Sequence, residues 1–491
     1  MTRIVVSLAE ETTAATLARM GELADVADVF EVRADLVRNL DLDALLRSRT
    51  KPLLLTCRAQ SEGGGWPDGD GEGRRRLLRE AVERGVDMVD VEHRAGFDDV
   101  VKAKAGHGLV LSFHDLEGTP ADLEGLFERM AASGADVVKI ATTARSVADL
   151  GRLAHFASRH AEGRPGLVAF AMGPLGVPSR LLGGRWGAPF VYAAAGAGRE
   201  VAPGQLPAAV LERTYRVRTV GPATRVYGLL GSDVLRSPSP AIHNRAFAER
   251  GIDAVYVPLP AESLPAFLQA LPALDLAGFS VTRPYKVEIL PHLARVDAVA
   301  AATGSVNTVV VGRDGALEGS STDGDGVLGP LRRRLDPAGR SVVILGAGGA
   351  ARAAAVALAR AGARVSVLAR RSEQAQAVAA VAAARYATLD ELAGLAWDVL
   401  VHATPVGSGA FPGQSLVPER LLRPGALVFD MVYEPRPTPL LRAAQAAGCV
   451  TVDGLEMLLA QAAGQFETWT GVPAPVEAMR EAAVEVLEEG R

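Results

Sequence analysis

The chain has 491 residues, of which 48% are hydrophobic and 22% charged, and its formal net charge is -5. The length predicts at least two domains, and a weakly negative soluble composition gives no reason to expect a nucleic-acid partner. No apolar run is long enough to cross a membrane, and Cys57 and Cys449 fit no disulfide or metal pattern, so we expect a cytoplasmic protein without a metal site.

The first 218 residues alternate short apolar runs with amphipathic segments. The apolar runs are rich in β-branched residues and predict buried strands, while the segments between them have helical spacing. Eight strands that alternate with helices predict a (β/α)8 TIM barrel over residues 1–218. A doubly wound open sheet is the alternative, but it would more often begin with a Gly-rich turn, which this half lacks. The predicted strands are Ile4–Leu8, Val29–Val32, Leu53–Cys57, Met88–Glu92, Leu109–Phe113, Val137–Thr142, Leu167–Ala171 and Phe190–Ala194.

Lys139 lies within one of these runs, Ala135–Thr142, in a chain that otherwise uses arginine for almost every cation. A desolvated lysine can lose its proton and attack a carbonyl, whereas an arginine cannot. A lysine whose ammonium group reaches solvent from a strand end is the alternative. We interpret Lys139 as a Schiff-base nucleophile. The other lysines are Lys51, Lys102, Lys104 and Lys286.

More polar side chains occur at the predicted C-terminal ends of the strands, where a barrel carries its chemistry. Arginines bind carboxylates, His114 can transfer protons, and Lys139 can condense with a ketone. An imine acidifies the adjacent C–H bond, so that elimination of water or cleavage of a C–C bond becomes accessible. These residues alone leave dehydratase and aldolase chemistry open. The polar set comprises Glu31, Arg33, Arg58, Glu62, His114 and Arg180.

Several motifs in this half, in order along the chain, resemble type I 3-dehydroquinate dehydratase. The resemblance implies that Lys139 forms an imine with the C3 carbonyl of 3-dehydroquinate and that His114 is the general acid/base of a syn elimination. It further implies that Glu62 lies beside the site, that Glu31 holds His114 or the pocket arginines, and that Gln205 belongs to a closing loop. Arg33, Arg58 and Arg180 would bind the substrate carboxylate and hydroxyls. The motifs are Phe30–Asp35, Thr56–Arg58, Glu62–Gly64, Ser112–Asp115, Val138-Lys139 and Ala202–Gln205.

One position departs from that family's pattern. Val201 precedes Ala202–Gln205 in the loop where the family usually has a serine. A substrate hydroxyl therefore loses a partner there, unless Glu200 replaces it.

A second α/β pattern follows the predicted linker 219–224, which contains Gly221-Pro222. We expect a domain over 225–330, with strands at Arg225–Gly231, Ala254–Leu259, Ala277–Val281 and Ser305–Val311.

The Gly-rich turn Gly346–Gly349 follows a buried strand, Ser341–Leu345, and begins an Ala-rich helix. This order predicts a Rossmann dinucleotide-binding domain over 331–455, with backbone N–H groups facing a pyrophosphate. The next strand, Arg364–Ala369, ends in Arg370 and Arg371 instead of the acidic residue typical of NAD enzymes, which favours the 2′-phosphate of NADP. The alternative is that Arg370 and Arg371 are ordinary surface cations. Strands at Asp398–Ala403 and Ala426–Asp430 continue this sheet, and helices over 456–491 are expected to return to the preceding domain.

Lys286 follows a predicted strand and a proline turn, and Asp323 is a candidate partner for it. A Lys–Asp pair can relay a proton to an alkoxide while hydride reaches a carbonyl. A structural ion pair is the alternative.

Residues 224–488 resemble shikimate dehydrogenase. The resemblance rests on the Gly-rich turn together with Ser237–Pro240, His243-Asn244, Thr282–Lys286, Gly304–Thr308, Thr322-Asp323, Asp430–Tyr433 and Gly454–Ala462. It implies that Lys286 and Asp323 are catalytic. The implied shikimate-binding residues are Ser237, Ser239, Thr282, Asn307, Tyr433 and Gln461. The implied NADP-binding residues are Gly346, Ala347, Gly348, Gly349, Ala350, Arg370, Arg371, Thr404, Met431 and Gly454.

Ser280 and Ser321 stand where asparagine is common in that family, and Arg371 stands where threonine is common. The two serines keep a hydrogen-bonding group, so they bear on substrate preference more than on activity. Arg371 adds a cation for the 2′-phosphate.

Together the halves predict a TIM barrel fused to a two-domain shikimate dehydrogenase-like α/β unit with a C-terminal Rossmann domain. The two resemblances imply consecutive reactions: dehydration of 3-dehydroquinate to 3-dehydroshikimate, then NADPH-dependent reduction to shikimate. The alternatives are a non-catalytic sensor of quinate or shikimate, and quinate dehydrogenation by the second half. We expect small molecules as the partners, and either a monomer or a homodimer.

Overall fold

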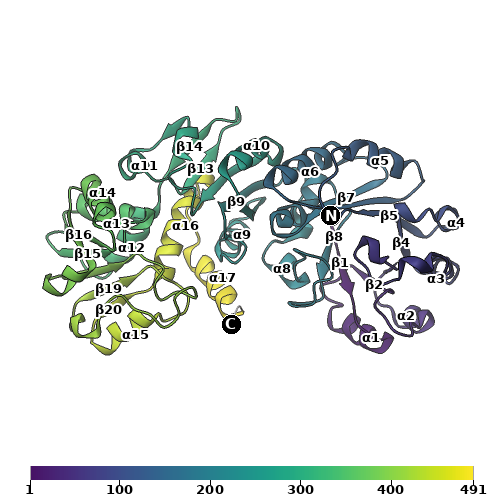
Figure 1. Cartoon of the computed structure of the whole chain (residues 1–491), viewed down its shortest axis with the longest axis horizontal. Coiled ribbons are helices and arrows are strands. Elements are labelled where there is room, and N and C mark those ends of the chain that lie inside the picture. The colour runs from purple at the N-terminus through teal and green to yellow at the C-terminus, as the bar shows by residue number, and fades with distance from the viewer. Residues whose placement is uncertain (1, 105, 490–491) are drawn as a thin grey trace. The chain divides into compact units, whose positions relative to one another are not determined.

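The computed structural model describes residues 2–104 and 106–489. The chain divides into two compact units, one of Met1–Pro240 with Asp253–Leu276 and the other of Ala241–Ile252 with Ala277–Arg491. Strands and helices alternate in both units, which confirms the predicted α/β class (Figure 1). Within the described residues, every helix is too short or too polar to span a bilayer.

The first unit contains the predicted barrel. Eight parallel strands have the order β7-β6-β5-β4-β3-β2-β1-β8, and helices surround them (Figure 1). The strands are β1 (Arg3–Leu8), β2 (Val29–Arg33), β3 (Leu53–Thr56), β4 (Met88–Glu92), β5 (Gly108–His114), β6 (Val137–Thr143), β7 (Gly166–Met172) and β8 (Phe190–Ala194). The helices are α1 (Thr13–Glu22), α2 (Leu42–Ser48), α3 (Gly71–Glu83), α4 (Asp98–Lys102), α5 (Leu123–Ala131), α6 (Val147–Arg159), α7 (Val177–Leu181) and α8 (Ala208–Arg213).

The interior of the barrel is apolar at one level and polar at the next. Val5 and Val29 are paired in register on β1 and β2 and belong to a buried hydrophobic cluster. Two residues further along, Ser7 is paired with Glu31. Because side chains alternate between the faces of a strand, Ser7 and Glu31 point into the barrel directly above the two valines. This polar level lies at the floor of the site described below.

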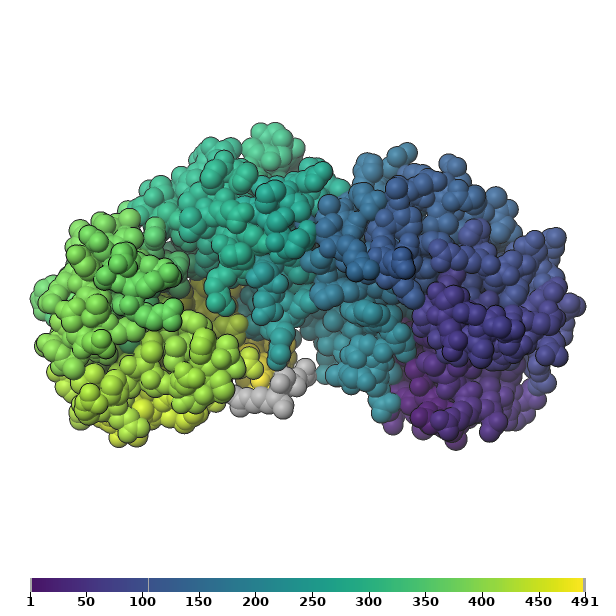
Figure 2. Space-filling view, in the orientation of Figure 1, coloured from purple at the N-terminus to yellow at the C-terminus, as the bar shows by residue number. Residues whose placement is uncertain are grey.

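The first unit continues into β9 (Arg225–Gly231), β10 (Ala254–Pro260) and α10 (Leu264–Leu274), with β9 and β10 parallel. Helix α10 packs against the barrel helix α6. In Figure 2 this segment is part of the teal surface. Glu262 accepts a hydrogen bond from the Val147 N–H at the start of α6 (3.1 Å). A Cβ atom added to Gly151 of α6 would lie 2.8 Å from the Cβ of Ala270, so the two helices meet too closely for a side chain at Gly151.

The second unit contains two groups of strands. The first comprises β11 (Leu276–Val281), β13 (Thr308–Val311), β14 (Leu317–Ser320) and β12 (Arg295–Val296), and β13 is antiparallel to both β11 and β14. Its helices include α11 (Ala298–Thr303) and α12 (Asp323–Arg332), and α9 (Ser239–Glu249) precedes them in the chain.

The other group is a parallel sheet with the order β17-β16-β15-β18-β19-β20. This doubly wound order confirms the predicted Rossmann domain, which binds its ligand where the strand order reverses, at the C-terminal ends of β15 and β18. The strands are β15 (Ser341–Leu345), β16 (Arg364–Ala369), β17 (Arg385–Thr388), β18 (Val399–His402), β19 (Leu427–Asp430) and β20 (Val450–Val452). The helices are α13 (Gly349–Arg360), α14 (Ser372–Ala382), α15 (Pro439–Ala446), α16 (Gly454–Thr470) and α17 (Val476–Glu489).

One predicted strand, Ser305–Val311, is shorter in the structure and begins at Thr308. Ser305 and Asn307 are buried polar residues, and Asn307 turns its amide toward residues of α12 and α16. The predicted strand thus begins three residues too early, because Ser305 and Asn307 belong to a polar site.

Two candidate active sites

A cavity of about 120 Å³ opens at the C-terminal ends of the barrel strands. It brings together every site residue predicted for the first half. Its polar lining comprises Ser7, Glu31, Arg33, Arg58, Glu62, His114, Lys139, Arg180, Tyr192 and Gln205.

Lys139 is almost completely buried in this cavity, with 4% of its surface exposed. Its Nζ lies 3.3 Å from Asp90 Oδ2 and 3.9 Å from Glu31 Oε1, and 4.1 Å from the centre of the Tyr192 ring. Burial lowers the pKa of Lys139, and the two carboxylates offset only part of that effect. The amine is therefore nearer to its neutral, nucleophilic form than a surface lysine is.

Asp90 is a site residue that the sequence analysis missed. Its Oδ2 accepts from Arg58 Nη2 (2.9 Å), and its Oδ1 accepts from the Ser112 hydroxyl (2.5 Å). Burial raises the pKa of Asp90, but the charges of Arg58 and Lys139 outweigh burial and hold it below its ordinary value. A permanent anion thus faces Lys139. The sequence contains one signal that points to Asp90: it is a carboxylate in the middle of the strand Met88–Glu92.

His114 is held by Glu62 and not by Glu31. The His114 Nδ1 lies 3.0 Å from Glu62 Oε2. Glu31 instead accepts hydrogen bonds from Ser7 (2.5 Å) and Thr56 (2.8 Å). The part of the resemblance that assigned Glu31 to His114 therefore does not match the geometry, because Glu31 lies lower in the barrel, at the level of Ser7.

The two members of the His114–Glu62 pair have opposite pKa shifts. Burial, with further contributions from the charges of Arg58 and Lys139, keeps the pKa of His114 well below its ordinary value. Burial also raises the pKa of Glu62 to about 7, and the nearby Glu92 adds to this shift. At neutral pH the imidazole is therefore uncharged and able to accept a proton.

Arg180 is the cavity arginine without a carboxylate partner among the described residues. Arg33 pairs with Asp35 (2.6 Å) and Arg58 with Asp90, whereas Arg180 donates only to the Pro203 carbonyl (3.0 Å). Burial alone lowers the pKa of Arg180 to about 9, and its Nε has no hydrogen-bond partner in the described structure. An uncompensated buried cation in a cavity predicts an anionic ligand.

Gln205 closes one side of the cavity through the loop that precedes it. Its Oε1 accepts from the Val201 N–H (2.9 Å), and its Nε2 donates to Ser7 (3.3 Å). Val201 itself lines the cavity and presents no hydroxyl there. The sequence departure at this position therefore lies at the site.

In the second unit, Lys286 and Asp323 form the predicted pair, with Nζ 2.5 Å from Oδ2. Asp323 is the first residue of α12, and its Oδ1 also accepts a hydrogen bond from Asn307 (2.8 Å). The side chain of Lys286 is 19% exposed and that of Asp323 only 2%. A buried carboxylate and an accessible ammonium suit a proton relay that faces a ligand.

A hydrogen-bonded group extends from this pair to α16. Asn307 donates to Asp323 Oδ1 (2.8 Å) and to Gln461 Oε1 (3.0 Å). Gln465 donates to the Asn307 carbonyl (2.9 Å) and accepts from the Ser280 hydroxyl (2.9 Å). Hydrogen bonds thus connect the predicted residues Asp323, Asn307 and Gln461, and Gln465 and Ser280 extend the group.

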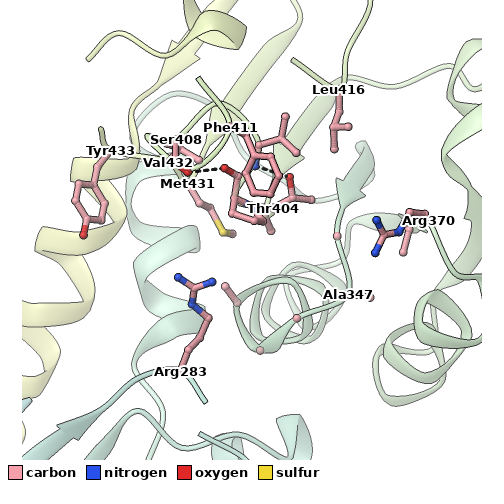
Figure 3. Close-up of a pocket in the computed structure, with 18 of the residues that line it drawn as sticks. Arg283, Ala347, Arg370, Thr404, Ser408, Phe411, Leu416, Met431, Val432 and Tyr433 are labelled. Carbon is pink, nitrogen blue, oxygen red and sulfur yellow. Dashed lines mark hydrogen bonds between the residues drawn. The ribbon is translucent and has the colours of Figure 1, made fainter. Parts of the chain in front are cut away.

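A larger cavity, of about 800 Å³, lies at the C-terminal ends of the Rossmann strands (Figure 3). Figure 3 shows Arg370 at one end, Tyr433 at the other, and Ala347 of the Gly-rich turn between them. Gly346 has φ +122, and a Cβ there would lie 2.7 Å from the Ala403 carbonyl oxygen, so the turn requires glycine. Predicted residues that line this cavity are Thr282, Lys286, Gly346, Ala347, Gly348, Gly349, Ala350, Arg370, Thr404, Met431 and Tyr433.

The residues of this cavity fit a dinucleotide phosphate. The first turn of α13 presents backbone N–H groups to a pyrophosphate, and Arg370 can pair with a 2′-phosphate. A Cβ on Gly349 would lie 3.6 Å from Lys286 Cδ, so the Lys286 side chain passes next to the Gly-rich turn. The same cavity can hold a cofactor next to the Lys–Asp pair.

Seven predicted residues are not part of the cavity lining: Asp323, Asn307 and Gln461, which form the hydrogen-bonded group described above, and four others. Arg371 caps α14 and is exposed, and Gly454 packs under Met431, where a Cβ would lie 2.5 Å from the Met431 carbonyl oxygen. Ser237 and Ser239 belong to the first unit, with their hydroxyls 3.1 Å apart. The binding roles of these four residues stay predictions.

Three family models match the chain. Type I 3-dehydroquinase matches residues 4–222, the shikimate dehydrogenase substrate binding domain matches 229–309, and the shikimate 5′-dehydrogenase C-terminal domain matches 454–484.

Known proteins are similar to the whole chain and to its second half. A bifunctional 3-dehydroquinate dehydratase/shikimate dehydrogenase of Arabidopsis thaliana, described as chloroplastic, is 36% identical over 92% of this chain and 79% of its own length. The structure of Thermus thermophilus shikimate 5-dehydrogenase with NADP(H) and shikimate is 36% identical, with a TM-score of 0.50 over 54% of this chain and 100% of that chain. Corynebacterium glutamicum quinate dehydrogenase with NAD is 33% identical, with a TM-score of 0.51 over 53% of this chain and 99% of that chain.

Proposed function

The chain belongs to the family of bifunctional 3-dehydroquinate dehydratases/shikimate dehydrogenases, and on that premise we propose how its residues divide the two reactions. It is an enzyme that dehydrates 3-dehydroquinate to 3-dehydroshikimate and reduces this ketone to shikimate with NADPH. The roles of individual residues in both steps are proposals that rest on the geometry above.

Dehydration takes place in the barrel cavity. The Lys139 amine attacks the C3 carbonyl, and loss of water gives an imine that acidifies the neighbouring C–H bond. The His114 Nδ1 is engaged by Glu62, so its Nε2 accepts that proton and returns it to the departing hydroxyl, which leaves as water. Arg180 binds the substrate carboxylate, while Arg33, Arg58 and Glu31 keep Lys139 and the hydroxyls in place. Hydrolysis of the product imine releases the enone and restores the amine.

Reduction takes place beside the Lys286–Asp323 pair. NADPH supplies the hydride when it is bound. Lys286 donates a proton to the oxygen that becomes the new hydroxyl, and Asp323 keeps the amine oriented. Asn307 and Gln461 bind substrate hydroxyls next to Asp323, and Thr282 and Tyr433 complete the ring pocket.

The observation that supports the dehydratase role most strongly is a buried amine and an unpaired buried arginine in one small cavity. A binding-only sensor needs neither a desolvated nucleophile nor a proton relay. Purified chain with 3-dehydroquinate and NADPH tests the proposal: enone absorbance should rise first, and NADPH absorbance should then fall. No rise in enone absorbance would contradict it. Turnover of quinate compared with shikimate tests the second half, and faster quinate turnover would contradict the shikimate assignment.

The dehydratase should lose activity as the pH falls through about 7. Glu62 has a raised pKa, so it is protonated below that pH and no longer stabilises the positive charge that His114 acquires during proton transfer. We expect kcat/KM for 3-dehydroquinate to fall on the acid side with a midpoint near pH 7. In Glu62→Gln this limb should disappear, with activity about 10²-fold lower at all pH values.

The loss of activity below pH 7 does not come from protonation of His114, because burial holds the pKa of His114 well below its ordinary value. Shikimate oxidation measured in the same samples serves as the control, because Glu62 belongs to the barrel alone. An unchanged acid limb in Glu62→Gln would assign the titration to another group.

Replacing Arg370 by leucine should weaken NADPH binding about 10- to 100-fold and leave NADH binding unchanged. The guanidinium lines the cofactor cavity at the end of β16, where only the 2′-phosphate of NADPH carries an extra charge. Arg371→Leu is the matched control, because Arg371 does not line the cavity and its loss should change the NADPH Kd much less. Fluorescence titration measures both constants, and equal losses in the two variants would give Arg371 the same role.

We propose the domains 1–218, linker 219–224, 225–330, 331–455 and C-terminal helices 456–491, of which residues 490 and 491 lie outside the described part. Gln461 and Gln465 of α16 accept hydrogen bonds from Asn307 and Ser280, which supports a return of the last segment to the substrate domain. We also propose a reducing compartment such as the cytoplasm, since Cys57 and Cys449 are both free thiols.

A further inference from the structure

A buried chain of hydrogen bonds leads from β19 to the cofactor cavity through His402. His402 ends β18, Asp430 ends β19, and the two residues are paired in register. Their exposed fractions are 1% and 0%. The sequence motifs gave His402 no role, and the reactions proposed above do not use it.

Every polar atom along this chain has a partner. The Asp430 Oδ2 accepts from the Thr438 hydroxyl (2.6 Å), and its Oδ1 accepts from the Val432 N–H (3.0 Å) and lies 2.8 Å from His402 Nδ1. On the other side of the ring, His402 Nε2 lies 2.6 Å from Thr404 Oγ1. The chain therefore ends at Thr404, which lines the same cavity as Met431 (Figure 3).

These partners determine where the protons lie. A carboxylate at Nδ1 fixes the proton of a neutral imidazole on that nitrogen, so Nε2 is an acceptor. The Thr404 hydroxyl then donates to Nε2, and its oxygen accepts from the Val406 N–H (3.3 Å). One lone pair of the Thr404 oxygen remains, on a residue of the cavity wall. The hydroxyl is thus available to a ligand as an acceptor and not as a donor.

We propose that His402 and Asp430 are positioning residues that hold the Thr404 hydroxyl as an acceptor for a donor group on the nicotinamide half of bound NADP(H). This half is indicated because Met431, whose N–H donates to the His402 carbonyl (3.0 Å), lines the same cavity as Thr404. The donor is either the carboxamide N–H or a ribose hydroxyl. The proposal rests on the cofactor site assigned above, but it requires no turnover of shikimate.

A double-mutant cycle in the full chain tests the proposal. His402→Leu removes the ring partner, Thr404→Val removes the hydroxyl at almost constant volume, and the third variant carries both changes. We expect each single change to raise the NADPH Kd about 3- to 10-fold, the range of one hydrogen bond. The double variant should be no weaker than the weaker single variant, because both changes break the same contact. Thr404→Ser, which keeps the hydroxyl, should bind within about twofold of wild type.

Fluorescence titration without substrate gives the Kd, so a failure of shikimate turnover in the wild type would leave this test intact. Adenosine 2′,5′-bisphosphate should bind all variants equally, because it lacks the nicotinamide half. With the 3-acetylpyridine analogue of NADP, a smaller loss in Thr404→Val assigns the carboxamide as the donor, and an equal loss assigns the ribose.

The rate of 3-dehydroquinate dehydration, measured with the same variant preparations, should equal that of the wild type and serves as the control for a folded barrel. Should His402→Leu lose the unfolding transition of the nucleotide domain, His402→Gln, which retains a polar group, takes its place in the cycle. Multiplicative losses in the double variant, or an unchanged NADPH Kd in Thr404→Val, would overturn the proposal.

Discussion

Replacing Lys139 by methionine should abolish dehydration of 3-dehydroquinate while NADP-dependent oxidation of shikimate continues at the wild-type rate. Methionine keeps an unbranched side chain as far as Cε but lacks the Nζ that lies over the Tyr192 ring, so it cannot form an imine. Removal of a covalent nucleophile costs a factor of about 10⁴ or more in kcat. Enone absorbance measures the loss.

Trapping of the imine gives a second, independent readout. Borohydride added in the presence of 3-dehydroshikimate should increase the mass of the wild-type chain by one reduced ligand, and Lys139→Met should show no increase. Lys104→Met is the matched control: it makes the same change at a lysine of the same barrel that bonds the Gly134 carbonyl and Asp136. A trapped adduct in Lys139→Met would show that another amine carries the reaction.

Lys286→Met should have the reverse effect. Without the amine that faces Asp323, the proton of the shikimate hydroxyl loses its acceptor at this position, so kcat for shikimate oxidation should fall about 10²- to 10⁴-fold. Dehydration should stay at the wild-type rate. NADPH absorbance follows the reaction, and fluorescence titration should give an unchanged NADPH Kd, which separates chemistry from cofactor binding.

Asp323→Asn completes this test. Because the two side chains act as one unit, the double variant should be no slower than the slower single variant. If either the Lys139 or the Lys286 substitution eliminated both activities, the assignment of two separate catalytic sites would be wrong.

The sequence predicts the fold well because most strands of the barrel and the central strands of the Rossmann sheet are buried on both faces. Runs such as Val137–Thr142 and Ser341–Leu345 are then nearly all apolar and easily recognised. The short strands β12, β14, β17 and β20 were missed for the opposite reason. β17 contains the exposed Arg385 and Tyr386, and its neighbours in the sheet, not its own residues, make it a strand.

The sites could be predicted as lists of residues, but their pairings could not. Lys139 and Asp90 are 49 positions apart and meet only because the barrel closes around them. The choice of Glu62 over Glu31 for His114 depends on the level at which each carboxylate enters the barrel. Likewise, the absence of a carboxylate partner for Arg180 within the described structure cannot be read from a local pattern, although this absence points to the ligand.

The tight meeting of α6 and α10 has a consequence for protein engineering. Strand β6, which carries Lys139, leads directly into α6, and α6 accepts at Gly151 only a neighbour as small as Ala270. A chimera that joined this barrel to another reductase would therefore need compatible small residues on the incoming helix and a carboxylate at the position of Glu262. Module exchange in this chain is limited by how two helices fit, and a longer flexible connector would not remove that limit.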